Sequence, residues 1–202
     1  AFAGSAQHAA PATPYVWSAI SGAAELACGD TITGFITLAG SETAGALCIK
    51  TRNRTLILYG NDVGDWNLVP VSEEAGARAY TNQFITQGVS LDTQGIALLN
   101  STQRYGNFQS AAASDKIESL LNGLVDTASA SCICRKKNQY RLFFSGGGAV
   151  YMTFKGSKVI GFTQIDLTDE VRCISSMEGE SGSEEIYYGS DDGFRPRQLG
   201  RI

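Results

Sequence analysis

A strand motif recurs along this chain at intervals of 40 to 45 residues. Residues 56–62 read Leu-Ile-Leu-Tyr-Gly-Asn-Asp, and residues 185–191 read Glu-Ile-Tyr-Tyr-Gly-Ser-Asp. Taking Tyr59, Leu99, Phe144 and Tyr188 as equivalent positions gives steps of 40, 45 and 44 residues. A period in the forties with several short strands per unit is typical of β-propeller blades. The repeat therefore predicts about four blades of roughly 43 residues each.

The rest of the sequence favours an all-β fold made of antiparallel blades. Short apolar runs rich in β-branched and aromatic residues alternate with Gly, Asn, Asp and Ser, a pattern typical of strands and turns. The expected strands are 32–38, 47–49, 55–59, 66–71, 80–85, 89–91, 96–99, 132–134, 139–144, 149–154, 158–165, 171–175 and 185–188. Residues 111–125 are the exception, since Ile117, Leu120, Leu121 and Leu124 have helical spacing. We expect one short helix there, with a long inter-blade connection as the alternative.

Three segments are expected. Residues 1–24 are rich in Ala, Ser, Pro and Gly and are predicted to be a flexible arm, in which Tyr15 and Trp17 could dock on a neighbouring surface. Residues 25–194 form the blade domain. Residues 195–202 contain Pro196 and alternate poorly, so they are interpreted as a basic tail, native or non-native, rather than as a further strand.

Composition excludes several classes of function. The chain has 16 Lys and Arg against 20 Asp and Glu, and this net charge of −4 argues against a specific or strong grip on nucleic acid. No apolar run reaches the length of a membrane span, so no membrane association is expected. Five cysteines without a repeated spacing do not indicate a disulfide framework, which suits a reducing cytoplasm. No motif in the sequence indicates a cofactor.

Catalysis by a Ser or Cys with a His base is excluded from residues 25–194, because His8 is the single histidine. One hydrolase hypothesis remains open. Cys132 and Cys134 precede Arg135 and Lys136, and an electropositive setting could lower a thiol pKa enough for attack on an ester or phosphoester. The alternative is that both cysteines are buried small hydrophobic residues.

Two further kinds of site have alternatives of their own. Asp191 and Asp192 belong to a carboxylate-rich segment that could bind a divalent cation, although a solvated acidic loop explains the same residues. Exposed aromatics such as Trp66, Tyr105 and Tyr151 could bind carbohydrate or a receptor, unless they belong to the core. Gly146-Gly147-Gly148 is expected to be a hairpin turn rather than a phosphate cradle.

Two stretches carry a resemblance to a known family. Residues 54–60, 80–81, 91–96 and 102–108 form the first, and residues 135–145, 150–156 and 189–194 form the second, which includes Asn138-Gln139-Tyr140-Arg141-Leu142-Phe143-Phe144. Together they resemble the β-propeller-bearing nozzle, or tail tubular, proteins of podovirus-like tailed phages.

The resemblance implies a structural virion protein, made in the bacterial host cytoplasm, that forms part of the tail through which DNA leaves the particle. It implies a homo-oligomer in contact with other tail proteins, and it carries over no catalytic residue. Members of that family are several times longer, so the chain is expected to be a fragment. About four blades are at the low end of what closes a propeller ring, so exposed blade faces are expected to associate with further copies.

Overall fold

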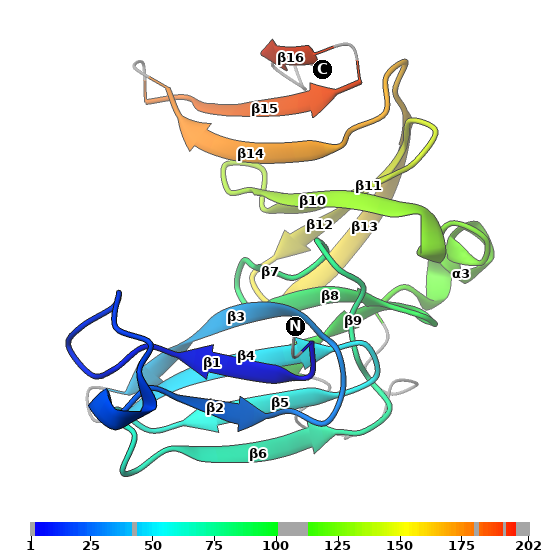
Figure 1. Ribbon diagram of the computed structural model, residues 1–202. Coiled ribbons are helices and arrows are strands. Elements are labelled where there is room, and N and C mark those ends of the chain that lie inside the picture. Colours follow the sequence, from blue (N-terminus) through cyan, green and yellow to red (C-terminus); the bar gives the residue numbers. More distant parts are fainter. Residues whose placement is uncertain (1–2, 42–43, 101–112, 180–181, 192, 197–202) are drawn as a thin grey trace.

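The computed structural model describes residues 3–41, 44–100, 113–179, 182–191 and 193–196, which form five antiparallel sheets stacked in an arc (Figure 1). The hairpin sheet consists of β1 (Ser5–His8) and β2 (Ala24–Ala27). The first sheet consists of β3 (Ile32–Ser41), β4 (Ala44–Thr51), β5 (Thr55–Tyr59) and β6 (Asn67–Ser72), and the second of β7 (Gln83–Phe84), β8 (Gly88–Asp92) and β9 (Gly95–Leu98). The third sheet consists of β10 (Ala128–Cys134), β11 (Gln139–Phe144), β12 (Gly148–Lys155) and β13 (Lys158–Asp166), and the fourth of β14 (Cys173–Glu178), β15 (Glu184–Ser190) and β16 (Gly193–Pro196).

The four sheets that follow the hairpin are propeller blades. Within each of them the strands pair in chain order, and the first strands of successive sheets contact one another: β3 with β7, β7 with β10, and β10 with β14. These first strands are therefore the innermost strands of the blades. They begin at residues 32, 83, 128 and 173, which are 45 to 51 residues apart. The prediction of an all-β propeller with about four repeats is confirmed.

The positions used to detect the repeat are not equivalent in the blades. Tyr59 ends the third strand of its sheet and Leu99 follows the third strand of the next, whereas Phe144 and Tyr188 lie in second strands. Each of these strands contains buried apolar residues and ends near a turn, so each gives the same sequence pattern although β9 is an outermost strand and β5, β11 and β15 lie between two others. The motif therefore counts blades correctly without fixing which strand it marks.

Apolar clusters fill the spaces between successive sheets. Ile36, Cys48 and Ile57 of the first sheet pack with Leu99 at the end of the second. The second and third sheets share the largest cluster, and the opposite face of the third sheet packs on the fourth. This last cluster consists of Ala130, Cys132, Cys134, Phe143, Ala149, Tyr151, Val171, Ile186 and Tyr188. The third sheet is consequently buried on both faces.

The amino-terminal segment corrects one expectation. Residues 1–24 were predicted to be a flexible arm, but Ser5–His8 form β1 and pair with β2 in register, Ser5 opposite Ala27 and His8 opposite Ala24. The hairpin packs through Ala6 and Leu26 on the face of the first sheet that carries Ile49. The His8 ring meets the Trp66 ring edge-on, with 4.7 Å between centroids. The blade domain therefore includes this hairpin.

The carboxyl-terminal segment corrects another. Pro196 was expected to prevent a strand, yet Gly193–Pro196 pair with β15, with Tyr188 opposite Arg195 and Tyr187 opposite Pro196. Proline is tolerated because β16 is the outermost strand of its sheet, where one side of the backbone needs no partner. Residues 197–202 of the predicted tail lie outside the described residues.

The expected helix is shorter than its pattern suggested. Residues 111–112 lie outside the described part, and the remainder forms two 3₁₀ turns (Asp115–Ile117 and Val125–Thr127) around α3 (Glu118–Leu121). Leu121 and Val125 pack in the cluster between the second and third sheets. The segment is thus both the short helix and the inter-blade connection. The Gly146-Gly147 turn between β11 and β12 is confirmed, with φ values of +87° and +89°.

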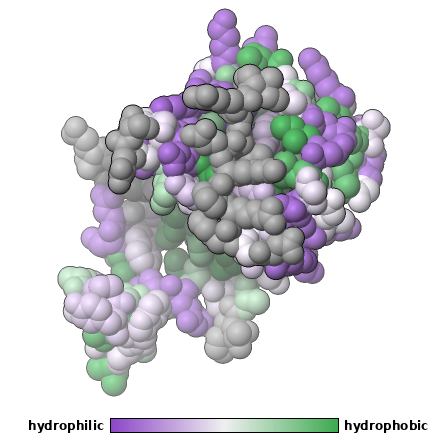
Figure 2. Space-filling model, turned by 90° about the horizontal axis from the view of Figure 1, so that it is seen from above, coloured by the Kyte–Doolittle hydropathy of each residue, from purple (hydrophilic) through white to green (hydrophobic). Residues whose placement is uncertain are grey.

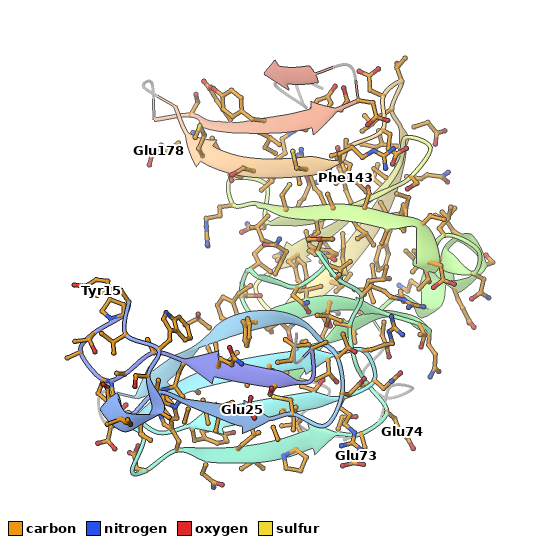
Figure 3. All side chains as sticks on the ribbon, viewed as in Figure 1. Tyr15, Glu25, Glu73, Glu74, Phe143 and Glu178 are labelled. Atoms are coloured by element: carbon orange, nitrogen blue, oxygen red, sulfur yellow. The ribbon has the colours of Figure 1, made fainter. Side chains whose placement is uncertain are left out.

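We predict that Phe143→Ala lowers the free energy of unfolding by about 3–5 kcal/mol, because Phe143 is fully buried between the third and fourth sheets. Phe143 is labelled in Figure 3. Urea unfolding followed by tryptophan fluorescence measures the change. Ile160→Thr is the control, since Ile160 lies in the same sheet with 59% of its surface exposed and should change stability by less than about 0.5 kcal/mol. Equal effects of the two changes would contradict the assigned core.

Candidate functional site

The innermost strands of all four blades border one cavity, which we call the axial pocket. Its volume is about 510 Å³. Its lining residues come from β3, from β7 and the loop before it, from β10, and from β14 with the residue before it. They are Thr33, Gly34, Phe35, Tyr80, Asn82, Gln83, Ser129, Ala130, Ser131, Arg172, Cys173 and Ile174. The pocket is thus rich in hydroxyl and amide side chains.

Hydrogen bonds fix the polar side chains on one wall of this pocket. Gln83 Nε2 donates to the Ser131 carbonyl oxygen at 3.0 Å and to Ser131 Oγ at 3.1 Å. Ser131 Oγ donates in turn to the Tyr80 carbonyl oxygen at 2.7 Å. Ser129 Oγ donates to the Val171 carbonyl oxygen at 2.7 Å. These bonds join the second, third and fourth blades at the axis.

Two residues of the loop before β7 are unusual. Tyr80 has a φ of +63°, a conformation that non-glycine residues rarely adopt, and its side chain is 76% exposed. Asn82 buries both its amide nitrogen and its amide oxygen without a hydrogen-bond partner among the described residues. The Asn82 amide lies against Gly34, where a β-carbon would come within 2.4 Å of Nδ2. Glycine at position 34 therefore makes the room for this amide.

Arg172 is the charged residue of the lining, and it is already paired. Its Nη1 lies 2.9 Å from Glu170 Oε1, while Nε and Nη2 bind the two Asp191 oxygens at 3.1 and 3.0 Å. The Arg172 guanidinium lowers the pKa of Asp191. The predicted cation ligand Asp191 is therefore the partner of an arginine, and Asp192 lies outside the described residues. Within the described part of the chain, no group of three potential ligands could hold a metal ion.

Cys132 and Cys134 are buried in the cluster between the third and fourth blades. Burial raises the pKa of Cys132 to about 12, against a smaller opposing effect of Arg141, and it raises the pKa of Cys134 as well. The direction is opposite to the one that a thiolate nucleophile requires. Burial therefore outweighs the lowering of the thiol pKa that was predicted from Arg135 and Lys136.

Arg141 is a buried cation that links these cysteines to the core. It is 1% exposed, its guanidinium carbon lies 4.3 Å from the centre of the Tyr151 ring, and its Nε and Nη2 bind Gln139 Oε1 at 3.2 and 2.9 Å. A buried cation needs such contacts to offset the loss of water. Arg141 belongs to the motif that carries the family resemblance, so that motif is part of the blade interior.

Glu184 joins the third blade to the fourth. Its carboxylate accepts hydrogen bonds from the backbone N–H groups of Arg135 and Lys136 at 2.7 and 2.8 Å and from Ser176 Oγ at 2.7 Å. Cys134 Sγ donates to the same carboxylate at 3.2 Å. Against a raising effect of burial, these bonds lower the pKa of Glu184 to about 2. The acidic segment thus contains a structural clamp.

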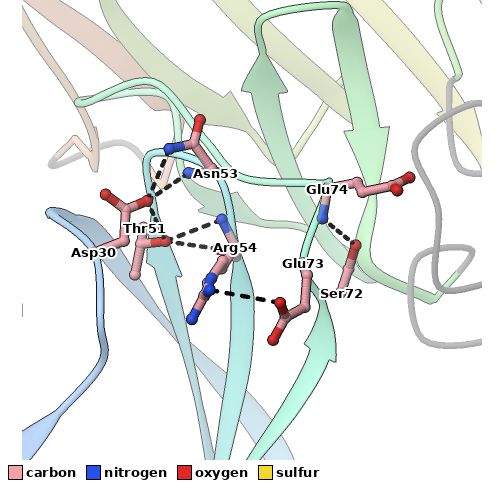
Figure 4. Close-up of polar contacts among 7 residues, drawn as sticks. All are labelled: Asp30, Thr51, Asn53, Arg54, Ser72, Glu73 and Glu74. Atoms are coloured by element: carbon pink, nitrogen blue, oxygen red, sulfur yellow. Dashed lines mark hydrogen bonds and ion pairs between the residues drawn. The ribbon is translucent and has the colours of Figure 1, made fainter.

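A second clamp closes the turn between β4 and β5 (Figure 4). Asp30 Oδ2 accepts from the Asn53 backbone N–H at 2.8 Å and from Thr51 Oγ1 and Asn53 Nδ2 at 3.1 Å. Arg54 on the same turn lies 3.5 Å from Glu73 after β6. The Asp30 carboxylate thus links the segment between β2 and β3 to the turn between β4 and β5 of the first blade. These contacts are structural, and none borders the axial pocket.

The predicted aromatic site is not assembled. Trp66 packs with His8 against the first blade, Tyr151 is buried under Arg141, and Tyr105 lies outside the described residues. The exposed aromatic residues of the axial pocket are Phe35 and Tyr80. Sequence reasoning missed this pocket because its lining comes from four segments of small polar residues. Residues 80–85 were predicted to be one strand, whereas β7 covers Gln83–Phe84 alone, so Tyr80 and Asn82 lie in the loop that lines the pocket.

No family model matches the sequence, and a search of curated proteins gives no match. Solved structures similar to the chain include Raptor from Chaetomium thermophilum, with 12% identity, a TM-score of 0.53, and coverage of 88% of this chain and 17% of that one. A second is BBS1N in complex with ARL6DN, with 7% identity, a TM-score of 0.49, and coverage of 87% of this chain and 54% of that one. A third is the N-terminal domain of Nup159, with 10% identity, a TM-score of 0.44, and coverage of 86% of this chain and 49% of that one.

BBS1N and the Nup159 domain are β-propellers. At these identities the likeness concerns the fold alone, and the chain spans less than two thirds of each of these proteins. Among the described residues, no helix has the length and apolar character to cross a membrane.

We predict that one cysteine of the folded chain, dilute enough to be monomeric, reacts rapidly with iodoacetamide at pH 7.5. Cys173 is exposed, while Cys28, Cys48, Cys132 and Cys134 are buried. Mass spectrometry should find one modified residue in the native chain and all five in urea. In Cys173→Ser the rapid reaction should disappear. Rapid labelling of Cys132 or Cys134 in that variant would show a reactive thiol where the structure has a protonated, buried one.

We predict that Glu184→Gln destabilises the fold at pH 7 by about 1 kcal/mol and has no effect near pH 2. The folded-state pKa lies below the ordinary value of 4.5, so the stabilisation is complete above pH 4.5 and is lost as the pH falls towards about 2. Urea unfolding at several pH values measures it. Glu178→Gln, on the exposed end of β14 labelled in Figure 3, is the control and should change little at any pH. A pH-independent loss in Glu184→Gln would contradict the carboxylate clamp.

Proposed function

We propose that this chain is a structural β-propeller module of a tailed-phage tail, of the nozzle or tail tubular kind, that acts in virion assembly and DNA passage. The proposal rests on the location in the fold of the residues that resemble those of the phage tail proteins. The second resembling stretch includes β11 and most of β12, whose side chains from Tyr140 to Phe144 and from Val150 to Met152 are buried. What the chain shares with that family is thus the interior of a blade, which supports a shared architecture rather than shared chemistry.

An inner surface with little uncompensated charge is compatible with a path for DNA through the assembled ring, which has to be wider than the axial pocket of one chain. A passage has to let the duplex slide, so it should not bind phosphates tightly. The charged lining residue, Arg172, is neutralised by Glu170 and Asp191, and the net charge of the chain is −4. In this proposal the protein is made in the bacterial host cytoplasm and resides in the virion tail with other tail proteins.

Association of copies is the second part of the proposal, and the open face of the fourth blade supports it. In β14, Ile174 packs on the third blade, whereas Cys173, Ser175 and Met177 on the opposite face are exposed. Met177 is 54% exposed. By contrast, five of the seven residues of β10 are buried. Viewed from above this blade, hydrophobic residues stand among hydrophilic ones in the part of the face that is not grey (Figure 2).

The other end of the arc offers a matching surface. The loop between β1 and β2 exposes Tyr15, Trp17 and Ile20. Figures 1 and 3 show this loop, marked by Tyr15, beside the first sheet and away from the fourth blade. A blade face is normally covered by its neighbour in the ring. We therefore propose that copies join head to tail, the aromatic loop of one copy covering the open face of the next.

The expected result is a multimer of the 21.5 kDa chain by light scattering, with rings around a central channel in negative-stain images. Met177→Glu should shift the mass towards the monomer, because it places a charge at the centre of the proposed contact. Ile160→Glu is the matched control and should leave the multimer intact, since Ile160 is equally exposed but lies on β13 of the third blade. A wild-type monomer at about 0.1 mM, a concentration well above the affinities of stable oligomers, would overturn the assembly.

A further inference from the structure

The axial pocket has features that blade packing leaves unexplained. Phe35 and Tyr80 both line it, and they are 51% and 76% exposed. Single exposed aromatic residues are common on protein surfaces, but two on the lining of one concave site are not accounted for by chance exposure alone. A volume of about 510 Å³ is within the roughly 300–1,000 Å³ of small-molecule sites.

The backbone holds Tyr80 in this place at a cost. A left-handed conformation costs a residue with a β-carbon about 1–2 kcal/mol. Ser131 Oγ donates to the Tyr80 carbonyl oxygen, and the next residue, Thr81, is fully buried and donates to the Arg78 carbonyl oxygen at 2.8 Å. Such strain persists only where the surroundings impose it, and it is common at ligand-binding residues. The fold therefore maintains a destabilising backbone conformation that places the Tyr80 side chain at the axis.

The hydroxyl groups of the lining are arranged as acceptors. Ser129 Oγ and Ser131 Oγ donate their protons to backbone carbonyl oxygens, and Thr33 Oγ1 donates to the Lys50 carbonyl oxygen at 3.2 Å. A hydroxyl that has donated its proton still offers its lone pairs. The complementary ligand is one that presents hydrogen-bond donors, in particular hydroxyl groups.

The electrostatics of the pocket favour a neutral ligand. Arg172 is bound to Glu170 and Asp191, so no uncompensated charge faces the cavity from the lining residues. The buried Asn82 amide adds one unpartnered donor and one unpartnered acceptor beside the axis. An unmade hydrogen bond in the interior costs about 1–3 kcal/mol, so a rotation that brings this amide to a polar ligand is favoured.

From these features we infer that the axial pocket is a binding site for a neutral oligosaccharide. The Phe35 and Tyr80 rings would lie against the C–H faces of sugar rings, since aromatic faces carry partial negative charge. Thr33 and Ser129 would accept hydrogen bonds from sugar hydroxyls, and Asn82 would pair with a hydroxyl or an acetamido group. Ser131 Oγ already accepts from Gln83 Nε2 and holds the wall in place. The inference does not depend on the phage-tail proposal, because every residue named belongs to one copy of the chain.

Isothermal titration of the whole chain with maltohexaose and with chitohexaose, a neutral polymer that carries acetamido groups, tests this site. We expect at least one of the two to bind, and Tyr80→Gly to weaken that binding by at least about tenfold. Glycine relieves the positive φ at this position, so the variant should fold at least as stably as the wild type, and loss of binding cannot be attributed to unfolding. Tyr80→Phe keeps the ring and should retain binding within about threefold.

Tyr59→Ala is the matched control, since Tyr59 is an exposed tyrosine on β5 that does not line the pocket, and it should bind as the wild type does. Heparin hexasaccharide and an uncharged ten-residue peptide serve as competing ligand classes. The inference is overturned if neither neutral oligosaccharide binds at millimolar concentration, if either competing class binds more tightly, or if Tyr80→Gly binds as the wild type does. Because binding is measured within one chain, it is independent of whether the copies form a ring.

Discussion

Burial of the third blade on both faces is the constraint on which the rest of this structure depends. Its strands β11 and β12 send alternate side chains into two different clusters, so Tyr140, Leu142 and Phe144 face the second blade while Phe143 and Tyr151 face the fourth. A small antiparallel sheet cannot be stable with both of these faces in water. The position of each neighbouring blade is therefore set by the need to cover one of them, and the angle between blades produces the axis.

Polar groups enforce the spacing that apolar packing alone would leave adjustable. Arg141 is held between Gln139 and Tyr151, and Glu184 reaches from β15 to the turn after β10. Between the first two blades, Lys50 is buried and donates to Thr55 Oγ1 at 2.7 Å, and its pKa is lowered by burial against the opposing influence of Asp92. A buried charge tolerates one geometry only, because a displaced partner leaves it unpaired. These contacts therefore constrain how neighbouring blades pack.

Sequence reasoning reached the blades because their signals are local. Alternating apolar residues that end at Gly or Asn turns define strands such as Thr55–Tyr59 and Gln139–Phe144 within a few residues, and the two have the predicted bounds. It failed at β1, since Ser5-Ala6-Gln7-His8 has little strand preference and is held by pairing with β2 and by the contact of His8 with Trp66. It failed at β16 because the tolerance of Pro196 depends on an outermost position that only the sheet order reveals.

The candidate site was harder to predict for a physical reason that applies to any propeller. The innermost strands also carry core residues such as Ile36, and the side chains that they turn towards the axis are mostly small and polar, so these give no apolar signal of their own. Ser129, Ser131, Thr33 and Gln83 look like ordinary strand residues until four separate segments meet. The site forms because side chains from four segments meet in space, and no sequence motif marks it. By contrast, Cys132 and Cys134 were proposed as nucleophiles because they precede Arg135 and Lys136. In the fold both thiols are buried, and the backbone N–H groups of Arg135 and Lys136 bind Glu184.

The open end of the arc and the axial pocket share one strand. β14 contributes Cys173 and Ile174 to the pocket lining, and the same strand exposes Cys173 and Met177 on the face where another copy is proposed to pack. A copy that covered that face would therefore contact the strand that forms one wall of the pocket. Where assembly alters ligand binding, thermodynamic linkage requires that ligand binding alter assembly by the same factor.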